Sequence, residues 1–194
     1  MRGSKIQKMA GIGVLASIAY ILMLLNFPIP GFPAFLKIDF SDIPALLATF
    51  LMGPLAGILV ELIKCGLDYM ITGSETAVPL GQLSNFIAGV VLILPTYFIY
   101  QKMKTKLGLS VGLVSGTLLM TFVMSLLNYF VLLPAYTLLL NFPVMSNAEM
   151  KSMITMAIIP FNIIKGLVVT AVFLVIFTRL QNWIQAKSLK SFGI

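Results

Sequence analysis

Side-chain amides inside apolar stretches are the residues of this chain most suited to binding chemistry. They are Gln82, Asn85, Asn128 and Asn162, and the amine Lys165 follows Asn162 by about one helical turn. A primary amide offers a hydrogen-bond donor and an acceptor together. Several amides at one depth would suit a planar heterocycle with alternating carbonyl and N–H groups, while Lys165 would suit a carbonyl, a ring nitrogen or an anionic group. The pattern predicts a site for a small, polar, partly aromatic solute.

The segment Phe32–Pro44 could form a wall of that site. It reads FPAFLKIDFSDIP, which is too polar and proline-rich for a membrane helix and too apolar for an ordinary exposed loop. A pocket wall that is apolar on one side and hydrogen-bonding on the other has such a composition. Its aromatic residues, together with Tyr129 and Phe130, could stack on a ring. An interfacial loop with aromatic residues at the lipid headgroups would have the same composition.

The composition identifies the environment of the chain. Of 194 residues, 59% are hydrophobic and 10% are charged, whereas soluble domains have about 25% charged residues. We therefore expect a single domain, residues 1–194, embedded in a lipid bilayer. The chain has no histidine, which excludes histidine metal sites and histidine general bases, and we predict no metal site. The net charge is +7, but a membrane topology explains where the basic residues fall. We therefore predict no nucleic-acid partner.

Six apolar stretches are expected to be membrane-spanning helices. They are Met9–Phe27, Ile43–Met52, Leu55–Ile71, Leu80–Tyr100, Val111–Leu133 and Met153–Phe177. The second, with about ten residues, is too short to cross a core of about 30 Å unaided. Either the preceding loop enters the membrane, or the helix continues past Gly53–Pro54. Pro134 is expected to end the fifth helix.

The basic residues predict the orientation of this bundle. With six spans, the N-terminal cluster, the cluster Lys102–Lys106 and the cluster Arg179–Lys190 all fall on one side, which the positive-inside rule makes cytoplasmic. A five-span arrangement would separate the last two clusters. We therefore predict an all-α, six-helix membrane bundle with both termini in the cytoplasm, and the amides then lie in its outer half, below the loop.

Two further patterns allow two interpretations each. Glu61, Lys64 and Asp68 share one face of the third span, either as a self-neutralising structural group or as the lining of a watered cavity. Gly13 and Ser17 in the first span would let another helix approach closely, either inside the bundle or from a partner.

Catalytic motifs are absent from the chain, so we predict no catalytic residues and no enzyme activity. There is no H-E-x-x-H, no G-x-S-x-G and no G-x-x-x-x-G-K-[ST]. If ATP drives transport of the solute, another chain must hydrolyse it. Six spans with a site on one side are typical of a capture subunit.

The chain resembles the substrate-binding S components of energy-coupling factor (ECF) vitamin transporters, and among them the riboflavin-specific members. The matching parts are AGIGVLASIAY, FPAFLKIDFSDIPALLATFLMGPLAG and FNIIKGLVV. The resemblance implies a protein of the bacterial cell membrane that captures riboflavin from outside, without any cofactor. It then docks on a transmembrane T component that carries two cytoplasmic ATPase subunits.

The resemblance also implies roles for individual residues. The flavin contacts would be Phe35, Leu36, Lys37, Gln82, Asn85, Asn128, Asn162 and Lys165. The nearest equivalent of the family's A-x-x-x-A docking pattern is Gly13 and Ser17, with Ala16 beside them. The alternatives are an S component for another vitamin, a structural membrane subunit without a small-molecule ligand and, least favoured, an intramembrane enzyme built on Glu61 and Lys64.

Overall fold

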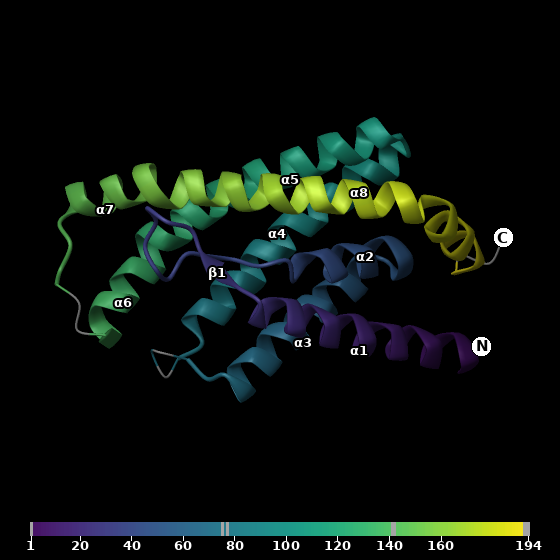
Figure 1. Cartoon of the computed structure of the whole chain (residues 1–194), viewed down its shortest axis with the longest axis horizontal. Coiled ribbons are helices and arrows are strands. Elements are labelled where there is room, and N and C mark those ends of the chain that lie inside the picture. The colour runs from purple at the N-terminus through teal and green to yellow at the C-terminus, as the bar shows by residue number, and fades with distance from the viewer. Residues whose placement is uncertain (1, 75, 77, 141–142, 192–194) are drawn as a thin grey trace.

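The helices of the computed structural model pack lengthwise into one bundle (Figure 1). The structure describes residues 2–74, 76, 78–140 and 143–191, and it describes side chains only within residues 5–180. The helices in chain order are α1 (Arg2–Leu24), α2 (Asp42–Met52), α3 (Pro54–Ile71), α4 (Leu80–Met103), α5 (Lys106–Leu127), α6 (Leu133–Leu140), α7 (Asn147–Met153) and α8 (Ile159–Ser191). The wider π-helical turns η1 (Asn128–Leu132) and η2 (Ile154–Ile158) connect α5 to α6 and α7 to α8.

Four helical segments among the described residues are long and apolar enough to cross a membrane. They are Lys5–Leu24, Leu80–Met103, Lys106–Leu140 and Asn147–Leu180. Helix α2 is apolar but shorter, and α3 carries Glu61, Lys64 and Asp68 within its length. The expectation of an α-helical protein that passes through the membrane several times is thus confirmed.

Helices α2 and α3 form a tight hairpin that places the polar part of α3 beside the start of α2. Gly53, at φ 95°, ends α2, and α3 begins at the next residue, Pro54. Gly57 allows the two helices to touch, because a Cβ atom there would lie 1.8 Å from Thr49 Oγ1. The alternative in which the second helix continues past Gly53–Pro54 is therefore wrong.

The loop between α1 and α2 folds back across one end of the bundle. Its ends pair as two short antiparallel strands, β1 (Phe27–Pro28) and β2 (Lys37–Ile38), with Phe27 opposite Ile38. The expected all-α fold did not include this ladder. Leu36 and Ile38 are buried in a small apolar cluster with Phe161 of α8, so the loop is anchored to the helices beneath it.

Two prolines are accommodated by wide helical turns instead of ending their helices. Pro134 and Pro160 are the second residues of α6 and α8. In front of them, the Leu133 amide bonds to the Asn128 carbonyl, and the Ile159 amide bonds to the Ile154 carbonyl. A proline lacks an N–H and collides with the carbonyl four residues earlier, and a π turn is one way to relieve this. The prediction that Pro134 ends the fifth helix was wrong.

Aromatic packing closes the bundle at the level of the last turns of α2. The ring of Phe50 lies 5.6 Å from Phe173, 5.3 Å from Phe177 and 5.1 Å from Tyr100, measured between centroids. Phe50 lies about 12 Å along α2 from Asp42, at 1.5 Å per residue. The polar residues of the loop end are therefore separated from the other end of the bundle by apolar packing.

Candidate ligand-binding site

Two adjoining cavities lie under the loop. The outer cavity has a volume of about 620 Å³ and is lined by the loop, the end of α3 and the start of α4. The inner cavity has a volume of about 100 Å³ and is lined mainly by the loop, α4, α5, η1 and α8. The two share five lining residues, Phe35, Lys37, Gly81, Asn85 and Tyr136. Together they form one site with a wide mouth and a narrow base.

The structure brings all eight sequence-predicted contact residues to this site. Gln82 lines the outer cavity, and Phe35, Lys37 and Asn85 line both cavities. The inner cavity is further lined by Leu36, Asn128, Asn162 and Lys165. Four separate segments of the chain therefore converge on one small volume, as the shared depth of the amides predicts. That these residues contact a ligand remains a prediction.

Asn128 and Asn162 are fixed by their own helices. The Asn128 amide nitrogen donates to the Met124 carbonyl at 2.8 Å, and the Asn162 amide nitrogen donates to the Ile158 carbonyl at 2.8 Å. Both side chains are buried. Each bond uses one amide hydrogen and fixes the orientation of the group, so the side-chain oxygen and the second amide hydrogen are what these residues can present to a ligand. Two fixed acceptors favour a ligand with an N–H group at that depth.

Lys165 is paired with carboxylates of the loop end. Its ammonium nitrogen lies 3.5 Å from Asp39 Oδ2 and 3.6 Å from Asp42 Oδ2. Asn85 of α4 also donates to Asp39 Oδ2, at 3.4 Å. Since two nearby carboxylates balance its charge, Lys165 suits a neutral carbonyl acceptor better than an anion. Asp39 and Asp42 were not among the predicted site residues, although their place in the FPAFLKIDFSDIP segment would have allowed that inference.

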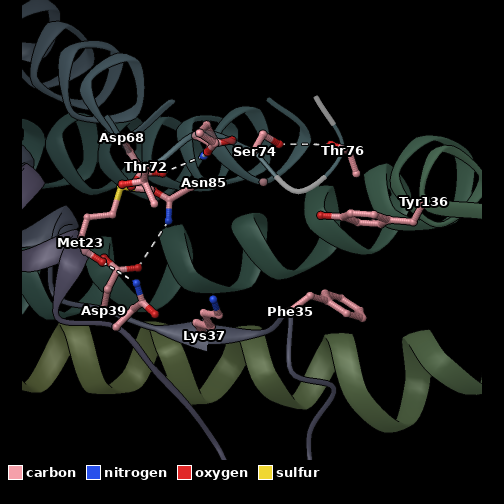
Figure 2. Close-up of a pocket in the computed structure, with 14 residues that line it drawn as sticks. Met23, Phe35, Lys37, Asp39, Asp68, Thr72, Ser74, Thr76, Asn85 and Tyr136 are labelled. Carbon is pink, nitrogen blue, oxygen red and sulfur yellow. Dashed lines mark hydrogen bonds between the residues drawn. The ribbon is translucent and has the colours of Figure 1, made fainter. Parts of the chain in front are cut away.

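Aromatic side chains of the outer cavity come from the loop and from α6. The rings of Phe35 and Tyr136 are 5.8 Å apart between centroids, at an angle of 35°. Figure 2 shows both side chains at one end of the cavity. Phe130, which we expected to stack on a ligand, is 69% exposed and lines neither cavity. Tyr136 was missed because the helix was expected to stop at Pro134.

The comparisons with known proteins agree with this architecture. Residues 7–177 match the family model described as "ECF transporter, substrate-specific component". The chain belongs to this family. It is 52% identical over 181 residues to the riboflavin transporter FmnP of Bacillus subtilis (strain 168), covering 93% of this chain and 95% of that protein. It is 43% identical over 179 residues to the riboflavin transporter RibU of Staphylococcus aureus (strain TCH60), covering 92% and 93%.

A solved S component of a bacterial ECF transporter has a similar structure. Its TM-score is 0.79 at 42% sequence identity, and the match covers 92% of this chain and 98% of that one. The family and its relatives are transporters, so this ECF substrate-specific component is a membrane transport protein and not an enzyme. The intramembrane enzyme considered for Glu61 and Lys64 is therefore set aside.

In this S component, Lys64 is the centre of a buried ionic network. Its ammonium nitrogen lies 2.6 Å from Asp42 Oδ1, 2.7 Å from Glu61 Oε2 and 2.7 Å from Ser41 Oγ. The Ser41 hydroxyl in turn donates to Asp39. Neither Glu61 nor Lys64 lines a cavity described here, so the structural interpretation of the pair holds. The network fastens α3 to the start of α2 and thereby fixes the two aspartates that face Lys165.

The third charged residue of α3 does line the site. Asp68 and Gln82 meet at the outer cavity, where the Gln82 amide nitrogen donates to Asp68 Oδ2 at 2.8 Å and to the Gly73 carbonyl at 3.0 Å. Helix α3 therefore satisfies both interpretations of its charged face: Glu61 and Lys64 are structural, and Asp68 is part of a cavity wall.

The small residues of α1 divide between two faces. Ala16 is fully buried against the bundle, whereas Gly13 and Ser17 are exposed. Apart from the adjacent residues and backbone of α1 itself, no atom of the described residues lies within 4 Å of the position that a Cβ of Gly13 would occupy. Of the three residues predicted for partner docking, only Gly13 and Ser17 are thus open to another protein.

Proposed function

We propose that this protein captures riboflavin from outside the cell and delivers it for import as the S subunit of an ECF-type transporter. The observation that carries the proposal is the convergence of Asn128, Asn162 and Lys165 in one inner cavity beneath the loop. The identities of 52% and 43% with two riboflavin transporters, each over more than nine tenths of the chain, support the same substrate.

The chemistry of the inner cavity suits the pyrimidine edge of a flavin. That edge presents a carbonyl, an N–H and a second carbonyl in sequence. The fixed side-chain oxygens of Asn128 and Asn162 can accept from the N–H, and Lys165 can donate to a carbonyl or to a ring nitrogen. Phe35 and Tyr136 supply aromatic surface for the remainder of the ring at the wider end of the site.

The proposed topology has six membrane crossings with both termini in the cytoplasm. Figure 1 places the start of α1 and the end of α8 at the same end of the bundle, and the turn with Lys102, Lys104 and Lys106 joins α4 to α5. The positive-inside rule puts this basic end in the cytoplasm of a bacterial cell. The loop and the two cavities then face outwards, where a captured vitamin arrives.

The proposed partners are a transmembrane T component and two cytoplasmic ATPase subunits. Membership of the ECF family supports them, and the chain has no phosphate-binding G-x-x-x-x-G-K-[ST] motif of its own. ATP hydrolysis on those subunits would drive release of riboflavin into the cytoplasm. Riboflavin is in this account the transported substrate, and no cofactor is required.

A titration in lipid nanodiscs tests the substrate. We expect the purified protein to quench riboflavin fluorescence saturably, at about one flavin per chain, with no competition from thiamin or biotin at the same concentration. Full retention of riboflavin fluorescence would overturn the riboflavin assignment. Binding of thiamin or biotin in its place would indicate an S component for another vitamin, and binding of none would favour a structural subunit.

A further inference from the structure

One wall of the outer cavity carries Asp68 of α3, Gln82 of α4, and Ser74 and Thr76 from the turn between these helices. Gln82 uses both hydrogens of its amide, one toward Asp68 Oδ2 at 2.8 Å and one toward the Gly73 carbonyl at 3.0 Å. Those two acceptors fix which end of the amide is nitrogen. The remaining atom, Gln82 Oε1, is buried and has no hydrogen-bond partner among the described residues. Because this oxygen is buried, the part that Gln82 plays toward a ligand is to hold Asp68 in place.

Two hydroxyl groups of the same wall use their hydrogens within the turn, where Ser74 Oγ and Thr76 Oγ1 also lie 3.2 Å apart. Ser74 donates to the Val78 carbonyl at 2.7 Å, and Thr76 donates to the same carbonyl at 2.5 Å. Each hydroxyl has a single hydrogen, so the oxygen that remains can only accept. Figure 2 shows Asp68, Ser74 and Thr76 along one side of the cavity, with Lys37 and Phe35 on the other.

The carboxylate of Asp68 in this wall favours a ligand that brings hydrogen-bond donors. A polyhydroxylated chain has one O–H donor on each carbon, whereas a phosphate monoester has a nearly doubly negative group that is rich in acceptor oxygens. Placed against this wall, a phosphate would leave the acceptors unsatisfied and would lie beside the carboxylate of Asp68. Burial strengthens that repulsion, because Asp68 is only 9% exposed.

We propose that Asp68, held by Gln82, is a specificity-determining residue that selects a hydroxylated, unphosphorylated side chain on the flavin. The inference rests on the proposed function, since it takes the pyrimidine edge to lie in the inner cavity and the ribityl chain in the outer one. Lys37, on the opposite wall, is the cation of this cavity that would favour a phosphate. Because Lys37 is exposed, solvent weakens its influence relative to that of Asp68.

Selectivity ratios measured on one variant at a time test the proposal. The full chain in nanodiscs is titrated with riboflavin, with flavin mononucleotide, and with lumiflavin, which has the ring without the hydroxylated chain. We expect Asp68→Asn to lower the preference for riboflavin over flavin mononucleotide at least tenfold. Gln82→Leu should lower the same preference about fivefold, because it removes the hydrogen bond that holds Asp68. Lumiflavin reports how much the hydroxylated chain adds to riboflavin binding in each variant. Lys37→Gln is the matched control. It should weaken flavin mononucleotide binding and thereby raise the preference for riboflavin over flavin mononucleotide.

The outcomes separate this proposal from the proposed function. If wild-type protein binds no flavin at all, the riboflavin assignment fails and this inference fails with it. If wild-type protein binds riboflavin but both variants keep its ratios within twofold, the inference alone is overturned. Because each ratio compares ligands on the same folded molecules, a smaller folded fraction of Asp68→Asn does not alter it. Should Asp68→Asn yield no folded protein, the Gln82→Leu ratio decides alone: a fall supports the inference, and an unchanged ratio overturns it.

Discussion

Lys165 Nζ lies 3.5 Å from Asp39 Oδ2, and this contact joins α8 to the loop that covers the site. The distance is longer than a hydrogen bond, so the ammonium group is held near the carboxylate while its hydrogens stay available to a ligand. Asp39 also accepts from Asn85 at 3.4 Å. One loop carboxylate thus positions two side chains that line the inner cavity.

Asp39→Asn should therefore weaken riboflavin binding by about tenfold to a hundredfold. The substitution keeps the size of the side chain but removes the charge that holds Lys165, and the lysine then loses part of its electrostatic support. Fluorescence-quenching titration measures the change. Glu149→Gln is the matched control, because Glu149 is exposed and its side chain, among the described residues, bonds only to Ser146, the N-cap residue of α7. Equal affinity in Asp39→Asn and the wild type would refute the positioning role.

The inner-cavity amides should matter individually. Asn128→Ala or Asn162→Ala should cost about 1–3 kcal/mol of riboflavin binding, the usual cost of leaving a buried partner unsatisfied. Each substitution also removes a bond to the helix's own carbonyl, so thermal unfolding without ligand must be measured alongside. Thr155→Ala serves as the control, since Thr155 likewise bonds to a carbonyl of its own helix but is exposed. Unfolding of both asparagine variants without any change in affinity would support a purely structural role for the amides.

Substitutions of Glu61 and Lys64 in the ionic network should change the stability of the protein more than its affinity for riboflavin. Lys64→Met should lower the free energy of unfolding by about 3–5 kcal/mol, because it leaves Glu61 buried without a cation and leaves Asp42 with only the longer contact to Lys165, at 3.6 Å. Glu61→Gln should cost much less. The ion pair with Lys64 is the contact of Glu61 Oε2, and Glu61 Oε1 has no hydrogen-bond partner among the described residues. The network of Asp39, Asp42, Glu61, Lys64 and Lys165 also has one more acidic than basic residue.

Thermal unfolding in detergent measures this difference. The double variant Lys64→Met with Glu61→Gln should recover part of the loss, because it removes the carboxylate that Lys64→Met leaves without a cation. A Glu61→Gln variant as unstable as Lys64→Met would show that Glu61 contributes more than its contacts indicate.

The sequence predicted the depth of the site in the bundle better than the contacts between its side chains. Asn128, Asn162 and Lys165 could be grouped because polar residues in apolar spans face the bundle interior, and periodicity with the positive-inside rule gave their depth. The pairing of Lys165 with Asp39 could not be derived, because it depends on how the loop folds over the helices. Tyr136 was not predicted as a site residue, because proline usually ends a helix and the fifth helix was expected to stop at Pro134. The π turn at η1 accommodates this proline, and the helix continues to Tyr136.

The exposed small residues of α1 give a prediction about the proposed T component. Gly13→Leu should weaken co-purification of this chain with its T component and lower ATP-dependent riboflavin uptake, while riboflavin binding by the isolated protein stays unchanged. The reason is that Gly13 has open space around its Cβ position, so a larger side chain disturbs only a helix that packs against it from outside. Ala16→Leu, one helical turn away but fully buried, should instead destabilise the bundle itself by overpacking. The two variants therefore separate docking from folding: if Gly13→Leu left uptake and co-purification at wild-type levels, the T component would have to dock on another face of the bundle.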